Sequence, residues 1–411
     1  MSVALLSFHI IVVVQTEKFV FPLRELHNLF TLIAGISLGA LAAISIPWFR
    51  QWSYELFLRG HQLLAVLFVY GTWQHLQGRS RLSNIYFFVG LGVFGLNFLF
   101  QLGLLLYRNG LFAGRGFLRA EMSFSTTKSK EDIVVTAAHV HVSLPRPVQL
   151  EAGQYINLWM PSVSLWSWAQ THPFTVTSWS KGPRNTIELL VQPCRGISAD
   201  LARYATVDGE TPVSFCALFT GPHGRSEDVR HYESILVIAS GFGIAAAIPY
   251  MKSMIYGYYT RTIKARRLHL VWQVGSRAEI TAAEHLLNNL LEDDHKDYGY
   301  ILNISIYMGD LAMERLLSGQ HKRVCFYQGA PDYRSIISVE ASGALIKRQP
   351  GDPLKRLTNV RDEQRRTLVM ASTTGKNRDC IRETVRSYLR QRVKLAELEY
   401  QPTESTPWGS S

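Results

Sequence analysis

Three long apolar segments, at residues 29–49, 56–76 and 84–107, constrain this chain more than any other feature of its sequence. Each contains few charged residues and is long enough to cross a hydrocarbon core of about 30 Å as a helix. The first 110 residues are therefore predicted to form an α-helical transmembrane bundle.

A fourth apolar run, at residues 3–14, is too short to span and allows two interpretations. It could be the core of a signal peptide, but it lacks a basic start and a small-residue cleavage site, and the polar stretch QTEK follows it directly. We interpret it as the end of a transmembrane helix whose beginning is missing from this sequence.

Two histidines lie in the second apolar segment, in the stretch GHQLLAVLFVYGTWQH. His61 and His75 are fourteen positions apart, which in a helix is about 21 Å along the axis and within about 40° in azimuth. Both rings therefore face the same way at two depths. Imidazole in hydrocarbon needs a partner, and neutral imidazole is a good ligand of haem iron. Two helices that each offer such a pair would hold two haems; alternatively, these side chains only contact water or lipid headgroups.

The rest of the chain has the mixed charged and apolar sequence of soluble domains. Residues 111–224 hold short β-rich runs separated by proline and glycine turns, which predict a small antiparallel β-barrel. In residues 225–411, buried strands alternate with helical stretches, which is typical of a parallel α/β sheet. We therefore predict three domains, at residues 1–110, 111–224 and 225–411.

The formal net charge of +11 does not indicate a nucleic-acid partner, because no cluster of lysine and arginine with interleaved aromatic residues is present. An anionic cofactor and an anionic membrane surface explain the charge equally well. The four cysteines are far apart and form no CxxC pair, which indicates free thiols in a reducing compartment. The loop charges weakly favour a cytoplasmic position for the soluble part.

The stretch THPFTVTSW, preceded by AGQYINLWMP, is a candidate flavin-binding strand. A flavin needs hydrogen-bond partners on its ring edge and an amide or cation near its pyrophosphate. A strand that carries His172 and Thr175 beside the fixed φ of Pro173 could supply them. The alternative is an ordinary strand of a barrel.

Two further stretches contain candidate phosphate-binding turns. In PCRGISADL, the Gly196 amide and the Ser198 hydroxyl could face a phosphate at a helix start, although a plain capped helix has the same sequence features. In ILVIASGFGIAAAIPY, an apolar strand enters a turn at Gly241 and Gly243 before a helix of small residues. Backbone amides can approach a pyrophosphate closely there, although many α/β crossovers need such glycines only for packing.

The ordered set YELFLRGH…H, GQY, HPFT, GFGIAAAIPY, HLVWQV, FYQGAPD and ELEYQP resembles the fungal-type ferric reductases, the metalloreductase transmembrane components of the NADPH oxidase superfamily. The resemblance covers about residues 30–402. It implies a haem-binding transmembrane bundle, an FAD-binding β-barrel and an NAD(P)-binding α/β domain of the ferredoxin-reductase-like kind. It also implies a multi-pass protein, most often of the plasma membrane, with cytoplasmic FAD and NADPH domains.

The resemblance assigns roles to residues of this chain. The haem-iron ligands would be His61 and His75, with His9 as the remnant of a first histidine helix. FAD would contact His172, Pro173, Phe174 and Thr175, with Gly196 and Ser198 near phosphate. NADPH would lie along Gly241, Gly243, Ile244 and Trp272, beside residues 327–331, which include Gly329 and Pro331.

The chain departs from the family pattern at three places. The usual Gly-Arg-Pro, whose arginine helps to select NADPH over NADH, is Gly329-Ala330-Pro331 here. The usual Cys-Gly-Pro after the late strand is replaced by MASTTG, at residues 370–375. The first histidine helix is cut short, so only His9 could represent it.

The resemblance implies an NADPH-dependent ferric-chelate reductase that passes electrons through FAD and haem b to Fe(III) or Cu(II) chelates outside the membrane. Membrane lipid and metal chelates are its expected partners, and no acid, base or nucleophile is required. One alternative is a superoxide-generating NADPH oxidase, although the second histidine pair of those enzymes is usually one residue closer. The other alternative is a truncated, catalytically impaired membrane scaffold.

Overall fold

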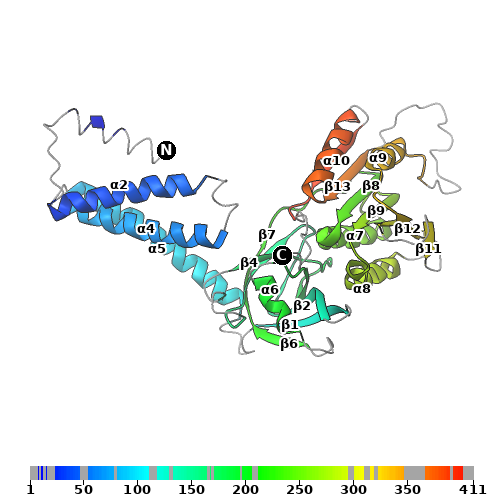
Figure 1. The fold of residues 1–411 in the computed structure, drawn as a ribbon, viewed down its shortest axis with the longest axis horizontal. Helices are drawn as coiled ribbons and strands as arrows, with labels where there is room; N and C mark the ends of the chain where they lie inside the picture. The colour runs from blue at the N-terminus through cyan, green and yellow to red at the C-terminus, as the bar shows by residue number, and fades with distance from the viewer. Residues whose placement is uncertain are drawn as a thin grey trace. The chain divides into compact units, whose positions relative to one another are not determined.

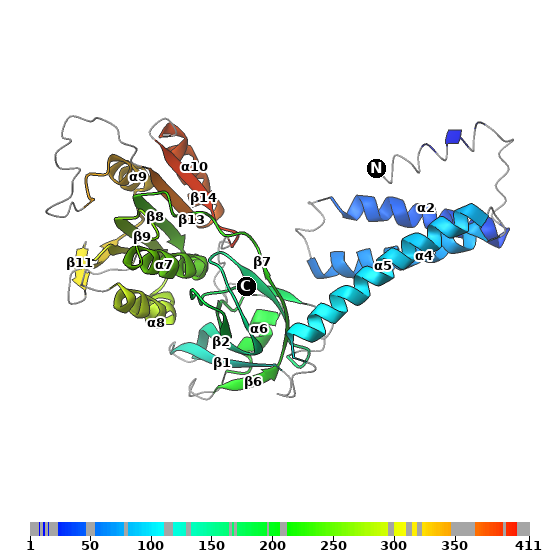
Figure 2. The ribbon, with the colours of Figure 1, turned by 180° about the vertical axis from the view of Figure 1, so that it is seen from behind.

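The structure is a computed structural model that describes residues 8, 11–12, 15, 24–46, 54–77, 81–110, 118–128, 133–163, 167, 171–194, 197–205, 212–294, 300–309, 315–318, 323–346, 366–388 and 392–400. The chain forms two compact units, Met1–Gly103 and Leu104–Ser411. Figure 1 and Figure 2 show the helices of the first unit in blue and cyan, and the sheets of the second unit in green to red.

All three predicted apolar segments form helices. These helices are α2 (Leu26–Ile44), α4 (Tyr54–Leu76) and α5 (Arg81–Arg108). By length and hydropathy, α2 and α5 qualify as candidate membrane spans. Along α5 no residue is buried, and large apolar side chains such as Phe94 and Leu96 are about two-thirds exposed, as expected of a surface that faces lipid.

Helices α2 and α4 pack closely because a glycine lies between them. A Cβ atom on Gly71 of α4 would lie 2.9 Å from the backbone oxygen of Phe30 and 3.1 Å from the Cβ of Ala34, both in α2. Small residues at such crossings let two backbones approach, which is how helices associate in a bilayer. This packing fixes which side chains of α2 face the two histidines of α4.

Residues 118–223 form two antiparallel sheets. Their elements are β1 (Arg119–Lys128), β2 (Ile133–Val148), β3 (Tyr155–Trp159), β4 (His172–Thr175), β5 (Arg184–Val191), α6 (Ile197–Ala202), β6 (Val213–Cys216) and β7 (Leu218–His223). The strand orders are β5-β2-β1-β6 and β4-β3-β7, and a bridge between Val176 and Leu189 joins the sheets. A single core lies between them, with Met122, Ile156 and Phe219 nearly inaccessible to solvent. The antiparallel prediction is confirmed, whereas closure into a barrel stays a prediction.

Residues 234–397 form an α/β layer structure, which confirms the predicted parallel sheet. Its strands are β8 (Ser234–Ser240), β9 (Arg267–Val274), β10 (Leu302–Met308), β11 (Arg315–Ser318), β12 (Val324–Gln328), β13 (Thr367–Ser372) and β14 (Val393–Glu397). Their order is β11-β12-β10-β9-β8-β13-β14, and the described pairings are parallel except that of β11 with β12. The antiparallel edge strand β11 was not predicted.

Helices cover both faces of this sheet, as Figure 1 and Figure 2 show. They are α7 (Ile244–Tyr259), α8 (Arg277–Asp293), α9 (Tyr333–Ser342) and α10 (Gly375–Ser387). Alternate residues of the fully buried β8 point to opposite faces: Val237 packs with α7 and α8, and Leu236 with α9 and α10. Because the chain leaves β8 toward β9 but later returns on its other side as β13, the topological switch point lies at the carboxyl end of β8.

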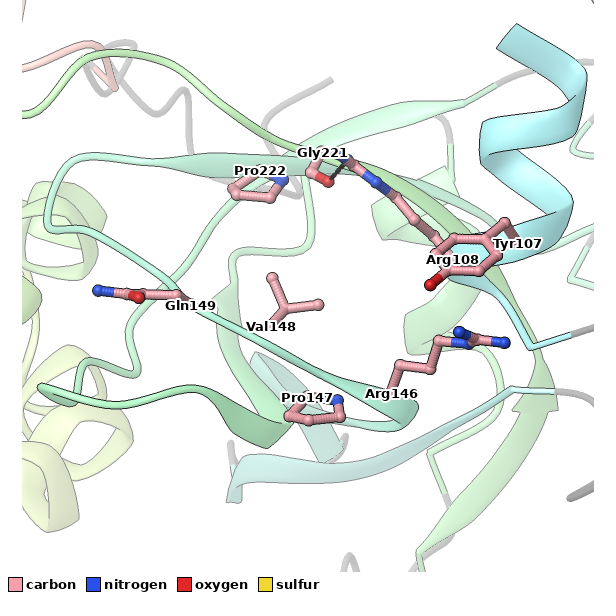
Figure 3. A pocket seen from close by; sticks show the side chains of 8 residues that line it. All are labelled: Tyr107, Arg108, Arg146, Pro147, Val148, Gln149, Gly221 and Pro222. Atoms are coloured by element: carbon pink, nitrogen blue, oxygen red, sulfur yellow. Dashed lines mark hydrogen bonds between the residues drawn. The ribbon is translucent and has the colours of Figure 1, made fainter. Parts of the chain in front are cut away.

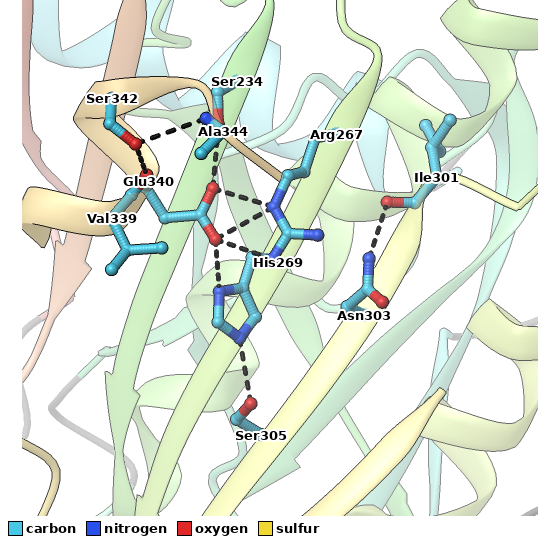
Figure 4. Close-up of polar contacts among 10 residues, drawn as sticks. All are labelled: Ser234, Arg267, His269, Ile301, Asn303, Ser305, Val339, Glu340, Ser342 and Ala344. Atoms are coloured by element: carbon cyan, nitrogen blue, oxygen red, sulfur yellow. Dashed lines mark hydrogen bonds and ion pairs between the residues drawn. The ribbon is translucent and has the colours of Figure 1, made fainter. Parts of the chain in front are cut away.

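A buried ionic cluster fastens α9 to the amino-terminal end of this sheet (Figure 4). The Glu340 carboxylate, 2% exposed, accepts hydrogen bonds from the Ser234 hydroxyl at 3.0 Å and from Arg267 at 2.7–2.9 Å, and lies 2.8 Å from His269 Nδ1. The other ring nitrogen of His269 lies 2.9 Å from the Ser305 hydroxyl. Burial alone would raise the pKa of Glu340, but the hydrogen bonds from His269 and Arg267 outweigh it and hold that pKa at about 2. The carboxylate therefore stays charged at neutral pH.

Candidate functional site

The glycine turn after β8 leaves its backbone bare at the switch point. Gly241 has φ +50°, a left-handed conformation that favours glycine, and within the described part of the chain a Cβ atom there would have one neighbour, Glu279 Oε2 at 3.7 Å. A Cβ atom on Gly243 would collide with the backbone oxygen of Ser372 in β13. Helix α7 begins at Ile244, directly after the turn. A pyrophosphate could therefore approach the backbone amides here.

Trp272 lies beneath this turn and is completely buried. Its Nε1–H donates a hydrogen bond of 2.8 Å to the backbone oxygen of Gly241. The indole was predicted to lie beside NADPH, and the structure puts it in the core, where it supports the backbone that would bind the cofactor. It is therefore a candidate positioning residue.

Glu279, in the first turn of α8, was missed by the sequence analysis. Its Oε2 accepts a hydrogen bond of 3.1 Å from the Gly275 amide, and burial raises the pKa of its carboxyl group while that hydrogen bond lowers it. An acidic residue after the second strand of a dinucleotide-binding domain is typically a ribose partner. That strand–turn–helix position could have identified Glu279 from sequence.

The carboxyl ends of β12 and β13 complete the same edge of the sheet. Gly329, at φ +87°, donates its amide to the Met308 backbone oxygen at 2.9 Å, and Pro331 is buried where the chain enters α9. Between them, Ala330 is exposed. The Ser240 hydroxyl accepts a hydrogen bond of 3.0 Å from the Thr374 amide, which ties the end of β13 to the end of β8.

The end of the described chain returns to this edge and meets the loop before α6. The Ser372 hydroxyl donates a hydrogen bond of 2.7 Å to the Tyr400 backbone oxygen. Burial, with a smaller effect of the nearby Cys194 thiol, raises the pKa of the Tyr400 hydroxyl to about 12. The structure thus holds Tyr400 against the carboxyl end of β13, at the glycine-turn edge.

The HPFT segment forms β4, an edge strand paired with β3. Pro173 is exposed and faces Asn157, which suits a residue without an N–H because the edge position requires no ladder bond from it. Phe174 packs against the core between the sheets, and Thr175 pairs with Tyr155 of the GQY motif. The two predicted flavin motifs are therefore neighbouring strands.

Ser198, predicted to lie near a flavin phosphate, forms a hydrogen bond within its own loop. The Ser198 hydroxyl accepts a hydrogen bond of 3.1 Å from the Cys194 amide and so closes the loop before α6. Gly196 lies outside the described residues. The role of both residues near phosphate stays a prediction.

A glycine also joins the flavin-side sheets to the α/β layers. Gly153 of GQY has φ +86°, and a Cβ atom there would lie 2.9 Å from the Cζ atom of Tyr250 in α7. The Tyr250 hydroxyl accepts a hydrogen bond of 3.0 Å from the Glu227 amide, and burial raises its pKa. These contacts place β3 and β4 in the same compact unit as the glycine turn.

In the first unit, the two predicted haem ligands differ in their surroundings. His75 Nδ1 lies 2.5 Å from the Thr31 hydroxyl of α2, the hydrogen-bond arrangement of metal-ligating histidines whose second nitrogen is oriented by a neighbour. Its ring stacks on that of His27, with centroids 5.2 Å apart and planes at 19°. His61 Nδ1 is buried without a hydrogen-bond partner among the described residues. His27 was missed because only the packing of α2 on α4 brings it there, and His9 lies outside the described residues.

These features fit the three implied cofactors to different degrees. The turn that is open at Gly241 and closely packed at Gly243 fits a dinucleotide pyrophosphate, and the exposed edge strand β4 beside β3 fits a flavin. The oriented ring of His75 and the orphaned nitrogen of His61 fit imidazole ligation of a haem iron.

Three protein-family models match successive parts of the chain. A ferric reductase like transmembrane component matches residues 1–72, an FAD-binding domain matches residues 125–227, and a ferric reductase NAD binding domain matches residues 232–366.

Known proteins match this chain at low sequence identity. Ferric reductase transmembrane component 3 of Saccharomyces cerevisiae is 25% identical over 55% of this chain and 29% of its own length. Mouse NADPH oxidase 1 is 24% identical over 44% of this chain and 31% of its own length. Among solved structures, ferredoxin-NADP+ reductase from Plasmodium falciparum aligns with a TM-score of 0.38 at 10% identity, over 68% of this chain and 95% of that one; a score of that size establishes no shared fold.

The chain thus spans less than a third of the length of these two curated relatives. Its transmembrane, FAD-binding and NAD-binding models nevertheless follow one another in order, and two of the three are described as ferric reductase domains. The chain belongs to the ferric reductase family.

Proposed function

We propose that this protein is an NADPH-dependent transmembrane reductase of external Fe(III) or Cu(II) chelates. The observation that carries the proposal is the glycine turn at the switch point, open at Gly241, in the same compact unit as the HPFT strand. The family membership supports it, and so do yeast relatives named ferric reductase and ferric/cupric reductase components. The fourteen-residue spacing of His61 and His75 favours metal reduction over superoxide formation.

The proposed division of labour follows the three predicted domains. Residues 225–411 would bind NADPH at Gly241, Gly243 and Ile244, while Trp272 holds the turn and the segment containing Gly329 and Pro331 borders the adenosine end. Residues 111–224 would form the FAD-binding barrel. Residues 1–110 would form the haem-binding bundle, which crosses the plasma membrane with the other two domains in the cytoplasm.

The flavin contacts would come from β4 and the loop before α6. They are His172, Pro173, Phe174 and Thr175, with Gly196 and Ser198 at the phosphates. When bound, NADPH would supply a hydride donor, FAD would supply a carrier that accepts electron pairs and releases single electrons, and haem b would supply a carrier of single electrons. The protein supplies their spacing and orientation and excludes water, and no side chain needs to act as acid or base.

The haem ligands would be His61 and His75, with His9 as a partner outside the described residues. If the larger unit is cytoplasmic, α4 runs outward, so His61 lies at the inner depth and His75 at the outer one. The Thr31 hydroxyl would then orient the outer ring through Nδ1.

The test is steady-state turnover of the purified full chain in detergent. Addition of NADPH should reduce a ferric chelate at a rate unaffected by superoxide dismutase, with flavin bound. Superoxide as the main product would support the oxidase alternative instead. A flavin-loaded chain that oxidises no NADPH would support the impaired scaffold.

A further inference from the structure

A cavity of about 570 Å3 lies where the last turn of α5 meets the antiparallel sheets, within the second unit (Figure 3). Its walls come from three segments: the helix end with Tyr107 and Arg108, residues 146–149 at the end of β2, and Gly221–Pro222 in β7. None of the residues proposed above for flavin, dinucleotide or haem lines it. The cavity is therefore lined by residues other than those of the proposed redox site.

The helix end is fixed to β7, so the cavity is preformed. Asn109 is 4% exposed, and its side-chain amide donates to the Phe219 backbone oxygen and accepts from the Phe219 amide, both at 2.9 Å. The Arg108 guanidinium donates to the Gly221 backbone oxygen. Three hydrogen bonds therefore hold the helix end against one strand.

The cavity is positively charged. The Arg146 guanidinium lies 3.9 Å over the centre of the Tyr107 ring, and its buried Nε–H has no hydrogen-bond partner in the described part of the chain. The lining residues include no acid, and neither Arg108 nor Arg146 forms an ion pair with a described carboxylate. Two guanidinium groups at one cavity, one with an orphaned donor, favour an anion as its ligand.

The position of the cavity identifies the source of that anion. Tyr107 and Arg108 are the last residues of α5, a candidate membrane span of 28 residues. Tyrosine and arginine at the end of an apolar helix are typical of the membrane–water interface. With the soluble domains in the cytoplasm, as in the proposed function on which this step rests, the anionic lipids of the cytoplasmic leaflet lie at that level, and the planar fork of arginine suits phosphate oxygens. We propose that this cavity binds the phosphate headgroup of an anionic membrane lipid.

The test measures binding to the full chain in neutral detergent. The probes are short-chain phosphatidylserine, short-chain phosphatidylcholine and inorganic phosphate. The variants are Arg146→Gln, which keeps the bond from Arg108 to Gly221, and the double variant Arg108→Gln/Arg146→Gln. Arg119→Gln, an exposed arginine of β1, is the matched control. Thermal unfolding and flavin content of each variant report folding and the redox site.

The proposal expects phosphatidylserine to bind more tightly than the other two probes. It also expects the double variant to weaken that binding about tenfold or more, the single variant to weaken it less, and the control to match the wild type, all with unchanged flavin content. Equal affinities of wild type and double variant would overturn the proposal, and so would phosphate that competes as well as the lipid. Loss of flavin in a folded Arg146→Gln chain would assign the cavity to the flavin instead.

Discussion

At the scale of single residues, Glu279 and Ala330 bear on the choice between NADPH and NADH. In the proposed NADPH site, Ala330 stands where the family pattern has an arginine, so we expect a charge-assisted hydrogen bond of about 1.5–3 kcal/mol to the 2′-phosphate to be missing. Glu279 adds a carboxylate close to the glycine turn. Arg277, exposed at the start of the same helix, remains a candidate partner for the phosphate. We therefore expect only a modest preference for NADPH.

Replacing Glu279 should strengthen that preference. Glu279→Gln removes a negative charge near the 2′-phosphate, worth about 1 kcal/mol at partial solvent exposure, so kcat/KM for NADPH should rise about fivefold relative to that for NADH. Glu284→Gln, exposed on the same helix, is the control. An unchanged ratio would remove Glu279 from cofactor selection. A wild-type preference above about a thousandfold would show that another residue recognises the phosphate.

Glu340 should contribute strongly to stability and make it depend on pH. Its pKa falls from 4.5 to about 2 in the folded protein, so its contribution, about 3 kcal/mol, is complete above pH 4.5 and is lost as the pH falls through 2. Glu340→Gln leaves the buried Arg267 without its counter-charge and should cost about 3–5 kcal/mol at pH 7.

The measurement is the unfolding midpoint of the full chain in detergent between pH 7 and pH 3. The gap between wild type and Glu340→Gln should narrow as the pH falls below 4.5. Glu227→Gln, which removes an exposed pair with Lys394, should change stability by less than about 1 kcal/mol. A gap that is independent of pH would mean that the lost contribution is packing rather than charge.

At the scale of elements, β4 should determine flavin binding. In the double variant His172→Ala/Thr175→Ala, polar groups are removed from an edge strand whose pairing with β3 depends on backbone bonds, so the fold should persist while bound flavin falls at least about tenfold. Thr186→Ala, on an exposed position of β5, should keep full flavin content. Undiminished flavin in the folded double variant would contradict the assignment of this strand.

Sequence patterns predicted the elements better than their side-chain contacts. The apolar segments and the alternation of buried strands with helices follow from local periodicity, so the helices α2, α4 and α5 and the parallel sheet were predictable. The burial of Trp272 under Gly241, and the stacking of His27 on His75, depend on packing between distant elements. The Ser198 hydroxyl, predicted to face a phosphate, accepts a hydrogen bond from the Cys194 amide. This contact depends on the conformation of the loop, which residue type alone does not determine.

At the scale of the whole molecule, haems held by His61 and His75 at two depths of α4 are predicted to carry electrons across the membrane. His75→Ala should remove the sharp reduced-haem absorbance of one haem, because imidazole ligation is lost. His27→Ala removes the ring stacked on His75 and should retain that haem. If His27→Ala loses haem and His75→Ala does not, the ligand set proposed from the fourteen-residue spacing is wrong.

In the proposed function, electrons cross the membrane from NADPH to a chelated metal. The direct measurement uses sealed lipid vesicles that contain the full chain, with a ferric chelate and a ferrous indicator trapped inside and NADPH added outside. We expect ferrous iron to form inside vesicles that contain the wild type, and very little to form in those that contain His75→Ala. Ferrous iron that forms only when the chelate is on the same side as NADPH would contradict transmembrane transfer.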